Sequence, residues 1–298
     1  VGRIIEDKEA SERYISHILN TITTRFDGIK VVVDCANGAA SFVAPEILRR
    51  AGAVVTAIHC SPNGLNINEG CGSTHLESLI AKVKEVGADL GIAHDGDADR
   101  VLAVDHTGAV IDGDHILGIL ASAIDIPTKT VVGTVMTNLG LIKALETRGI
   151  SFIATPVGDR YVLEKMIAEN HHIGGEQSGH IIIRKFSNTG DGILTAVQLI
   201  SEVAQSGKSL NALASFMSRY PQLLINVKGV AKDKLETNQK IKDQIADASA
   251  KLGSSGRVLL RASGTEPLVR VMVEAESAQV AQEIADSLAA LVKSELSF

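Results

Sequence analysis

Three aspartates at alternate positions are the residues of this sequence best suited to bind a metal ion. Asp95, Asp97 and Asp99 stand in the segment D-G-D-A-D-R, directly after an apolar run. Carboxylates this close repel one another, and a hard divalent cation that prefers oxygen ligands, such as Mg²⁺, relieves that repulsion. The small residues Gly96 and Ala98 allow the backbone to curl so that all three side chains point inward. The spacing therefore predicts a magnesium site.

Other sites that begin with alternate aspartates fit this segment less well. An EF-hand loop has Gly at its sixth position and Glu at its twelfth, where this sequence has Arg100 and His106. A phosphatase with an aspartate nucleophile also carries D-x-D after a strand, so a hydrolase stays open as an alternative. A solvated acidic turn is the simplest alternative. In a metal site, Arg100 can offset the negative charge or hold a phosphate oxygen.

The segment G-G-E-Q-S-G-H has the composition of a sugar-binding loop. Its glycines allow a ligand to approach the backbone closely. The side chains of Glu176, Gln177, Ser178 and His180 offer hydrogen-bond donors and acceptors to hydroxyl or amino groups. An ordinary polar turn between two strands is the alternative.

The segment R-A-S-G-T-E-P-L-V-R near the C-terminus has the composition of an anion site. The backbone N–H groups of a Ser-Gly-Thr turn can surround an anion, and Ser263 and Thr265 add hydroxyl donors. Arg261 and Arg270 can add charge-assisted hydrogen bonds. The segment is not a Walker loop because it has no G-K-[ST]. A plain hairpin loop flanked by arginines is the alternative.

A fourth polar loop, T-P-V-G-D-R, stands between an expected strand and an expected helix. Arg160 lies where that helix begins, and helix N-termini favour anions. By itself, this loop is weak evidence for an anion-binding site.

Charge and composition limit the classes of protein to which the chain can belong. The formal net charge is -6, and no block of Lys and Arg is present, which argues against a nucleic-acid partner. No apolar run approaches the roughly 18 residues of a membrane span. The three cysteines, Cys35, Cys60 and Cys71, form no C-x-x-C pair, so we expect free thiols in a reducing compartment. These features predict a cytoplasmic protein.

Strands alternate with helices over most of the chain, which predicts the α/β class with mostly parallel sheets. We expect two tandem α/β domains with mixed or parallel sheets, at residues 1–110 and 111–220, and a smaller α+β domain at 221–298. In the first two domains we expect strands at 29–34, 53–58, 88–93, 101–105, 130–135, 151–154, 173–175 and 181–184 and helices at 42–51, 75–86, 139–148, 157–170 and 192–205. In the last domain we expect strands at 223–228, 258–261 and 268–275 and helices at 234–252 and 278–293.

Taken in order along the chain, these loops resemble those of the α-D-phosphohexomutase family. D-G-D-A-D-R is similar to the magnesium loop of that family, G-E-Q-S-G-H to its sugar loop, and R-A-S-G-T-E-P to its phosphate loop. V-V-D-C-A-N-G-A-A at 32–40 resembles the start of the second domain of the family. N-I-N-E-G-C-G-S-T-H at 66–75, T-P-V-G-D-R-Y-V at 155–162, and Gln177 resemble the phosphoglucosamine mutases of the family. The phosphomannomutases and phosphoglucomutases are the nearest alternatives.

The resemblance implies an isomerase that interconverts glucosamine 6-phosphate and glucosamine 1-phosphate through a phosphoserine and a 1,6-bisphosphate. It implies a role in amino-sugar metabolism and in making cell-wall precursors, and it leaves a homodimer open. Asp95, Asp97 and Asp99 are then the Mg²⁺ ligands, and His180 is a candidate proton carrier. The substrate-binding residues that it implies are Gly158, Asp159, Arg160, Glu176, Ser178, His180, Arg261, Ser263, Gly264, Thr265 and Arg270.

One feature of that family is missing from this sequence. The nucleophile of the family is a serine in a loop of the type T-A-S-H-N-P, in a first domain. Here Ser16 and His17 are followed by Ile18 and Leu19 rather than by Asn and Pro. The resemblance therefore implies that the serine lies upstream, in a domain of roughly 100–150 residues, and that this chain alone is inactive. A phosphosugar-binding module without catalysis stays open as an alternative.

Overall fold

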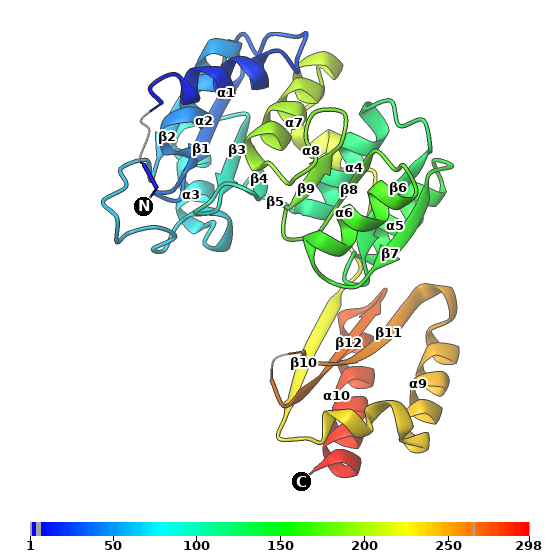
Figure 1. Cartoon of the computed structure of the whole chain (residues 1–298). Helices are drawn as coiled ribbons and strands as arrows, with labels where there is room; N and C mark the ends of the chain where they lie inside the picture. The colour runs from blue at the N-terminus through cyan, green and yellow to red at the C-terminus, as the bar shows by residue number, and fades with distance from the viewer. Residues whose placement is uncertain (1, 4–6, 265, 298) are drawn as a thin grey trace. The chain divides into compact units, whose positions relative to one another are not determined.

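The computed structural model describes residues 2–3, 7–264 and 266–297 and divides the chain into two compact units (Figure 1). The first unit comprises residues 1–137 and 143–217, and the second comprises 138–142 and 218–298. The mixed α/β class predicted from the sequence is confirmed. The division into three domains at 1–110, 111–220 and 221–298 stays a prediction.

A five-stranded mixed sheet forms the N-terminal part of the first unit. Its strand order is β2-β1-β3-β4-β5, in which β1, β2 and β3 run parallel, β4 pairs antiparallel with β3, and β5 pairs antiparallel with β4. The strands are β1 (Lys30–Asp34), β2 (Val54–Ile58), β3 (Leu90–His94), β4 (Val101–Asp105) and β5 (Val110–Ile111). The helices of this part are α1 (Ala10–Leu19), α2 (Ala40–Ala51) and α3 (Glu77–Val86), with the 3₁₀ turn η1 (Gly72–Thr74).

A second sheet of the first unit repeats this pattern with four strands, as the sequence predicts. Its order is β7-β6-β8-β9, with β6, β7 and β8 parallel and β9 antiparallel. The strands are β6 (Thr130–Thr134), β7 (Ser151–Thr155), β8 (Ile173–Gly175) and β9 (Ile181–Ile183). The helices are α4 (Gly113–Ala123), α5 (Leu139–Glu146), α6 (Asp159–Ala168), α7 (Gly192–Ser206) and α8 (Leu210–Ala214).

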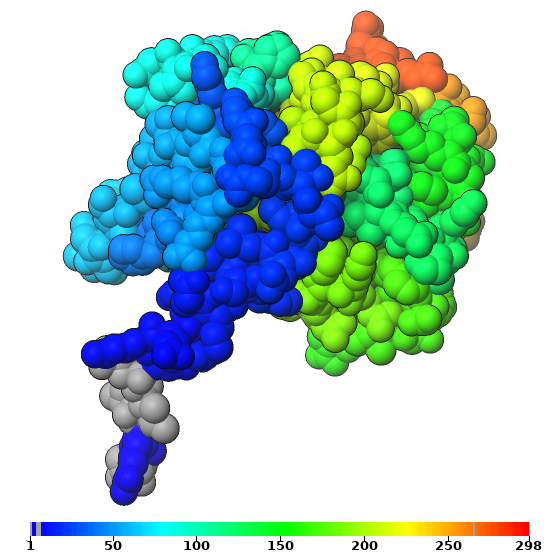
Figure 2. Space-filling view, turned by 90° about the horizontal axis from the view of Figure 1, so that it is seen from above, coloured from blue at the N-terminus to red at the C-terminus, as the bar shows by residue number. Residues whose placement is uncertain are grey.

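Within the first unit, residues of the N-terminal segment contact helix α7 and the residue that caps it, and these contacts join the two parts of the unit. The phenol of Tyr14 on α1 donates to Asp191 at 2.9 Å, and the Gln198 amide on α7 donates to the Thr21 hydroxyl at 2.8 Å. Figure 2 shows the dark-blue N-terminal residues lying against yellow-green residues of this later part of the chain. The buried centres of both sheets consist of apolar residues, as expected of strands covered on two faces.

The second unit is an antiparallel sheet packed against two helices. The strand order is β10-β12-β11, and the central strand β12 is buried along most of its length. The elements are β10 (Gln222–Lys228), η2 (Lys232–Thr237), α9 (Gln239–Leu252), η3 (Gly253–Ser255), β11 (Gly256–Ala262), β12 (Leu268–Ala275) and α10 (Ala278–Leu296). Valines of β12 and apolar residues of α9 and α10 form its core.

Two helices differ from the sequence prediction for identifiable reasons. The helix predicted over 234–252 is a 3₁₀ turn followed by α9, because the Asn238 side chain accepts from the N–H of Ile241 at 3.1 Å and caps a new helix. Helix α4 was not predicted. Its residues are buried almost all round, so it lacks the polar face that gives an amphipathic period. None of the helices in the described part of the chain is long and apolar enough to cross a membrane.

The Asn238 cap predicts a measurable contribution to the stability of the second unit. We expect Asn238→Ala to lower its free energy of unfolding by about 1 kcal/mol, because the Ile241 N–H loses its acceptor. Asn238→Ser should lower it less, since a serine hydroxyl can cap the same N–H. Urea unfolding followed by far-UV circular dichroism measures both. Equal losses for the Ala and Ser variants would contradict the capping role.

Candidate functional site

The three aspartates lie in a tight connection between two antiparallel strands. Strand β3 ends at His94, and β4 begins at Val101. The loop curls back because Ala98 adopts a left-handed conformation, with φ of 60°, and its N–H donates to the Asp95 carbonyl at 3.1 Å. The Arg100 N–H donates to the Asp95 carboxylate at 3.1 Å. One carboxylate oxygen from each of the three aspartates then lies within 4.8 Å of the other two.

This loop holds more negative charge than its own cation balances. Burial and the neighbouring carboxylates of Asp99 and Asp97 raise the pKa of Asp95 to about 6, although the hydrogen bond from the Arg100 N–H acts in the opposite direction. The Arg100 guanidinium lies 3.6 Å from Asp95 and 3.7 Å from Asp99. In the described chain, the buried Oδ1 of Asp99 has no hydrogen-bond partner. Three convergent oxygen ligands with unbalanced charge fit a hard divalent cation.

The predicted sugar loop contacts the aspartate loop directly. Residues 176–179 form the turn between β8 and β9, and Gly179 (φ of 94°) accepts from the N–H of Val101 at 3.1 Å. Nδ1 of the buried His180 lies 3.0 Å from Oδ2 of Asp99. Two segments that the sequence separates by some 80 residues therefore meet at one point.

The loop at 155–160 also joins this site, through its backbone. Oε1 of Glu176 accepts from the N–H of Gly158 at 3.0 Å. Asp159 begins α6, and its carboxylate lies 4.0 Å from Nε2 of His180. Arg160 is 81% exposed and forms its ion pair with Glu164 of its own helix at 2.7 Å. The structure therefore brings Gly158 and Asp159 to Glu176 and His180, but Arg160 points to solvent.

The remaining predicted residues of the sugar loop differ in their environment. Ser178 is exposed at the tip of the turn. The side-chain amide of Gln177 donates to Asp112 at 3.3 Å, and the Gln177 carbonyl accepts from Gly113 at 3.0 Å. Asp112 is the N-cap of α4 and also contacts His115 at 2.7 Å. Gln177 is thus tied to the start of a helix.

Sequence reasoning missed the segment that holds these loops together. A Cβ on Gly190 would lie 2.3 Å from the His180 ring, and one on Gly192 would lie 2.3 Å from the Arg100 carbonyl. Asp191 between them caps α7 by accepting from Leu194 at 2.9 Å. The N–H of Gly192 donates to the Ala98 carbonyl at 2.9 Å. The signal in the sequence is Gly-Asp-Gly at the start of an expected helix.

His94, the last residue of β3, contacts the backbone at the other end of the aspartate loop. It is fully buried, and its Nδ1 lies 3.3 Å from the carbonyl of Arg100 at the far end of the loop. Burial lowers the pKa of His94 to about 4, so the ring is neutral at physiological pH. A neutral imidazole adds no charge next to the aspartates while it fixes the width of the loop.

The predicted anion loop lies in the second unit and has its own charge imbalance. Arg261 on β11 stands directly opposite Arg270 on β12, and in the described chain neither buried Nε has a hydrogen-bond partner. Burial and the Arg270 charge lower the pKa of Arg261. Like charges that face each other across a sheet are destabilising. An anion bound here would relieve that repulsion.

The turn beside these arginines presents small residues and one further cation. The Ser263 hydroxyl accepts from Glu266 N–H at 3.3 Å, and Gly264 has open space around it. Thr265 lies outside the described residues. The ammonium of Lys232, which the sequence did not single out, donates to the Ser263 carbonyl at 2.5 Å. Three cations therefore surround this turn.

Close packing at Gly192 predicts a strong effect of a single methyl group. We expect Gly192→Ala to lower the free energy of unfolding of the first unit by about 1–3 kcal/mol, because its Cβ would overlap the Arg100 backbone. Urea unfolding measures this change. Gln205→Ala, at the far end of the same helix, is the control and should lose less than about 1 kcal/mol. Equal effects of the two substitutions would show that the contact is not tight.

The pKa of Asp95 predicts the sign of a pH effect on the metal-free chain. An unfolded chain releases the Asp95 proton near pH 4, whereas the folded chain holds it to about pH 6. Stability contributed by this group is therefore lost as pH rises from about 4 through about 6. The difference in free energy of unfolding between wild type and Asp95→Asn, measured by urea titration across this range, should change with pH. Parallel curves for the two proteins would contradict the raised pKa.

Comparison with known proteins assigns the whole chain to one family. The phosphoglucomutase/phosphomannomutase models of α/β/α domain II, α/β/α domain III and the C-terminal domain match residues 12–108, 112–220 and 224–291. The phosphoglucosamine mutase of Thermobifida fusca is 56% identical over 100% of this chain and 67% of its own length. That of Streptomyces coelicolor is 54% identical over 99% of this chain and 66% of its own length. The chain thus spans about two thirds of the length of these relatives.

Solved structures show the same fold at low sequence identity. A phosphoglucomutase/phosphomannomutase family protein from Burkholderia thailandensis has a TM-score of 0.78 at 23% identity, covering 97% of this chain and 66% of its own. The N-acetylphosphoglucosamine mutase of Aspergillus fumigatus, in complex with GlcNAc-6P and magnesium, has a TM-score of 0.74 at 20% identity, covering 95% and 64%. The models, the relatives and the fold agree, and the chain belongs to the phosphoglucomutase/phosphomannomutase family.

Proposed function

We propose that the protein to which this chain belongs is a phosphoglucosamine mutase, which interconverts glucosamine 6-phosphate and glucosamine 1-phosphate. The observation that carries this proposal is the contact of His180 with Asp99, which joins a carboxylate cluster to a loop rich in sugar-binding groups. The similarity of the whole chain to phosphoglucosamine mutases supports the choice of substrate. The three free cysteines fit a reducing, cytoplasmic location.

In this proposal Asp95, Asp97 and Asp99 would hold Mg²⁺. The ion would supply positive charge to a phosphoryl group in transfer, which is the main requirement of such chemistry. The fit rests on three oxygen ligands that converge and on the negative charge that these carboxylates concentrate in one loop. Arg100 lies beside two of the ligands and can hold a phosphate oxygen.

Glu176, Ser178 and His180 would bind the sugar. The exposed Ser178 can donate to a hydroxyl, and the carboxylate of Glu176 suits hydroxyl or ammonium groups. His180 lies between the carboxylates of Asp99 and Asp159, so a proton on either ring nitrogen has an acceptor nearby. We assign to it the role of proton carrier. Gly158, held by Glu176, would shape the same pocket, and Arg160 would reach an anion by leaving Glu164.

Arg261 and Arg270 would hold the phosphate that does not react, together with Ser263, Gly264 and Thr265. The two guanidinium groups face each other and lack partners at Nε, so one anion would satisfy both. A clamp of this kind suits a substrate that binds in two orientations, since either phosphate of a 1,6-bisphosphate can occupy it. The phosphoserine that exchanges the phosphoryl group would lie in a segment outside this chain.

A mutase assay tests the function. A longer protein that carries this chain and the nucleophilic serine should form glucosamine 1-phosphate from glucosamine 6-phosphate with Mg²⁺. Asp97→Ala should lower kcat at least about 100-fold, because metal ligands carry several kcal/mol of charge stabilisation. The present chain alone should show no turnover. Free phosphate released by the present chain would support a phosphatase instead, and no conversion by the longer folded protein would refute the mutase.

The arginine pair predicts anion-dependent stability. Inorganic phosphate should raise the Tm of the second unit, because it neutralises Arg261 and Arg270. We expect Arg270→Gln to raise the Tm in the absence of anion and to remove most of the phosphate effect. Thermal unfolding followed by circular dichroism, with and without phosphate, measures both. Arg257→Gln is not a suitable control because Arg257 pairs with Glu274, so Lys228→Gln on β10 serves instead. A phosphate effect that survives in Arg270→Gln would contradict the clamp.

A further inference from the structure

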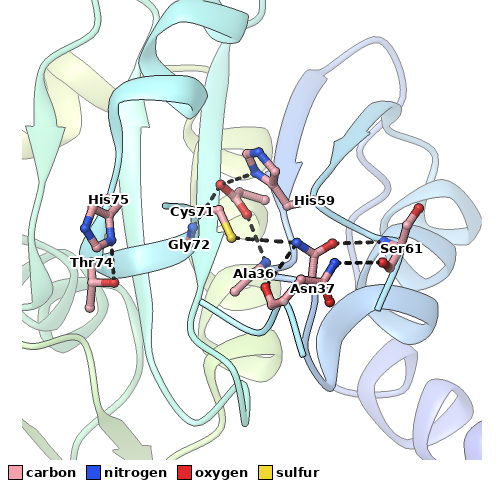
Figure 3. Close-up of polar contacts among 10 residues, drawn as sticks. Ala36, Asn37, His59, Ser61, Cys71, Gly72, Thr74 and His75 are labelled. Atoms are coloured by element: carbon pink, nitrogen blue, oxygen red, sulfur yellow. Dashed lines mark hydrogen bonds and ion pairs between the residues drawn. The ribbon is translucent and has the colours of Figure 1, made fainter. Parts of the chain in front are cut away.

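A second cluster of ligand-type side chains lies at the carboxyl end of the first sheet, apart from the three aspartates (Figure 3). Asp34 is the last residue of β1, His59 directly follows β2, and Cys71 directly precedes η1. One oxygen, one nitrogen and one sulfur atom of these residues lie within 4.8 Å of one another. Three separate loops therefore converge on one point.

The carboxylate of Asp34 is the centre of this cluster. It is fully buried, and Oδ2 accepts from the Gly72 N–H at 3.0 Å and lies 2.9 Å from Nδ1 of His59. Oδ1 accepts from the Ala36 N–H at 2.9 Å. The ion pair that the described chain provides for Asp34 is with His59, which is charged only when protonated. Hydrogen bonds satisfy both oxygens of this carboxylate, so a bound cation would balance its negative charge rather than fill an unpaired position.

The backbone holds the three loops in place without any ligand. Ala36, Asn37 and His59 all adopt left-handed conformations, with φ of 52°, 49° and 47°. The Asn37 N–H donates to the His59 carbonyl at 2.7 Å, and the Asn37 side chain accepts from Ser61 at 3.1 Å and lies 3.9 Å from Sγ of Cys71. Figure 3 shows Asn37 between the loop of Ser61 and the sulfur of Cys71. The backbone therefore keeps the three donor atoms close together without a ligand.

We propose that Asp34, His59 and Cys71 bind a soft divalent cation of the zinc class. A sulfur, an imidazole nitrogen and a carboxylate oxygen form a ligand set typical of Zn²⁺, whereas Mg²⁺ prefers oxygen alone. Zinc bonds of about 2.0–2.3 Å place tetrahedral ligands roughly 3.3–3.8 Å apart. The observed donor atoms lie between 2.9 Å and 4.8 Å from one another, so shifts of about 1 Å suffice. The fourth position is left for water.

A nucleophilic role for this cysteine fits the geometry less well. Burial and the nearby carboxylates of Asp34 and Glu69 raise the pKa of the Cys71 thiol. A reactive cysteine needs the opposite environment, one that favours the thiolate. The imidazole nitrogen Nδ1 of His59 faces Asp34, so the dyad it forms is with a carboxylate.

The proposed cation would lie directly behind the loop of the three aspartates. A Cβ on Gly72 would stand 2.5 Å from the carbonyl of His94, and the Ala39 N–H donates to the Gly96 carbonyl at 2.8 Å. A cation that ties Asp34, His59 and Cys71 together would therefore fix the backbone on which the aspartate loop rests. This role does not require the cation to take part in the proposed mutase reaction.

Cobalt titration of the present chain tests the site, because Co²⁺ occupies zinc sites and reports its ligands by absorption. The titration is carried out in excess Mg²⁺, which saturates the all-oxygen aspartate site. We expect one equivalent of Co²⁺ to produce the near-ultraviolet band of a thiolate–cobalt bond, and Zn²⁺ to abolish it by displacement. We expect His59→Asn to weaken Co²⁺ binding at least about tenfold, and Asn tolerates the left-handed backbone at this position.

Matched variants identify the ligands. Cys71→Ser should abolish the thiolate band, while Cys60→Ser, which changes the cysteine next to His59, and Asp97→Asn should both retain it. Circular dichroism establishes that each variant is folded. If Cys71→Ser does not fold, the Co²⁺ affinity of His59→Asn decides the test. The proposal is overturned if the wild-type chain gives no thiolate band, if the band survives in Cys71→Ser, or if a folded His59→Asn binds Co²⁺ as tightly as wild type.

Discussion

Close approach of backbone segments at the aspartate loop is the constraint on which the rest of the first unit depends. A Cβ on Gly179 would lie 2.1 Å from the Val101 carbonyl, and one on Gly192 would lie 2.3 Å from that of Arg100. Only glycine allows backbones to come this near. Because they do, the ring of His180 reaches Asp99, and α7 begins against the same loop. The glycines thus decide where the functional side chains meet.

Both candidate binding regions concentrate charge of one sign, which is negative at the aspartate loop and positive at the arginine pair. The aspartate loop concentrates three carboxylates around one guanidinium, and burial together with the neighbouring carboxylates raises the pKa of Asp95. The strand pair of the second unit places Arg261 opposite Arg270, and burial together with the Arg270 charge lowers the pKa of Arg261. A metal ion at the aspartate loop and the phosphate of a phosphosugar at the arginine pair would supply the opposite charges. For the arginines, the pairing of β11 with β12 holds like charges together that would separate in an unfolded chain.

An uncharged histidine, His94, contacts the backbone of the aspartate loop. His94 spans the base of the loop as an uncharged ring, whose pKa of about 4 follows from full burial. The carboxylate of Asp34, which lies behind the same loop, is satisfied by two backbone N–H groups and by His59. The buried carboxylate of Asp34 is therefore hydrogen-bonded at both oxygens, whereas Nε2 of His94 has no hydrogen-bond partner in the described chain.

The sequence by itself determined the order of the elements, the α/β class and the loops that carry chemistry. Strands and helices follow from local patterns of apolar residues, which is why most predicted elements of the two sheets were confirmed within a few residues. Local patterns did not predict α4, because its residues are buried on almost all sides and show no amphipathic period. They also did not predict that the side-chain cap at Asn238 divides one expected helix into a 3₁₀ turn and α9.

Only the tertiary structure decided which of these loops meet. Asp99 and His180 are far apart in the sequence, and their contact depends on the register Arg100↔His180 and on glycines whose close contacts are with distant segments. The same is true of Gln177 with Asp112, of Lys232 with Ser263, and of Asp34 with His59 and Cys71. Contacts between distant segments depend on packing and chain topology, which periodicity in a single sequence does not encode.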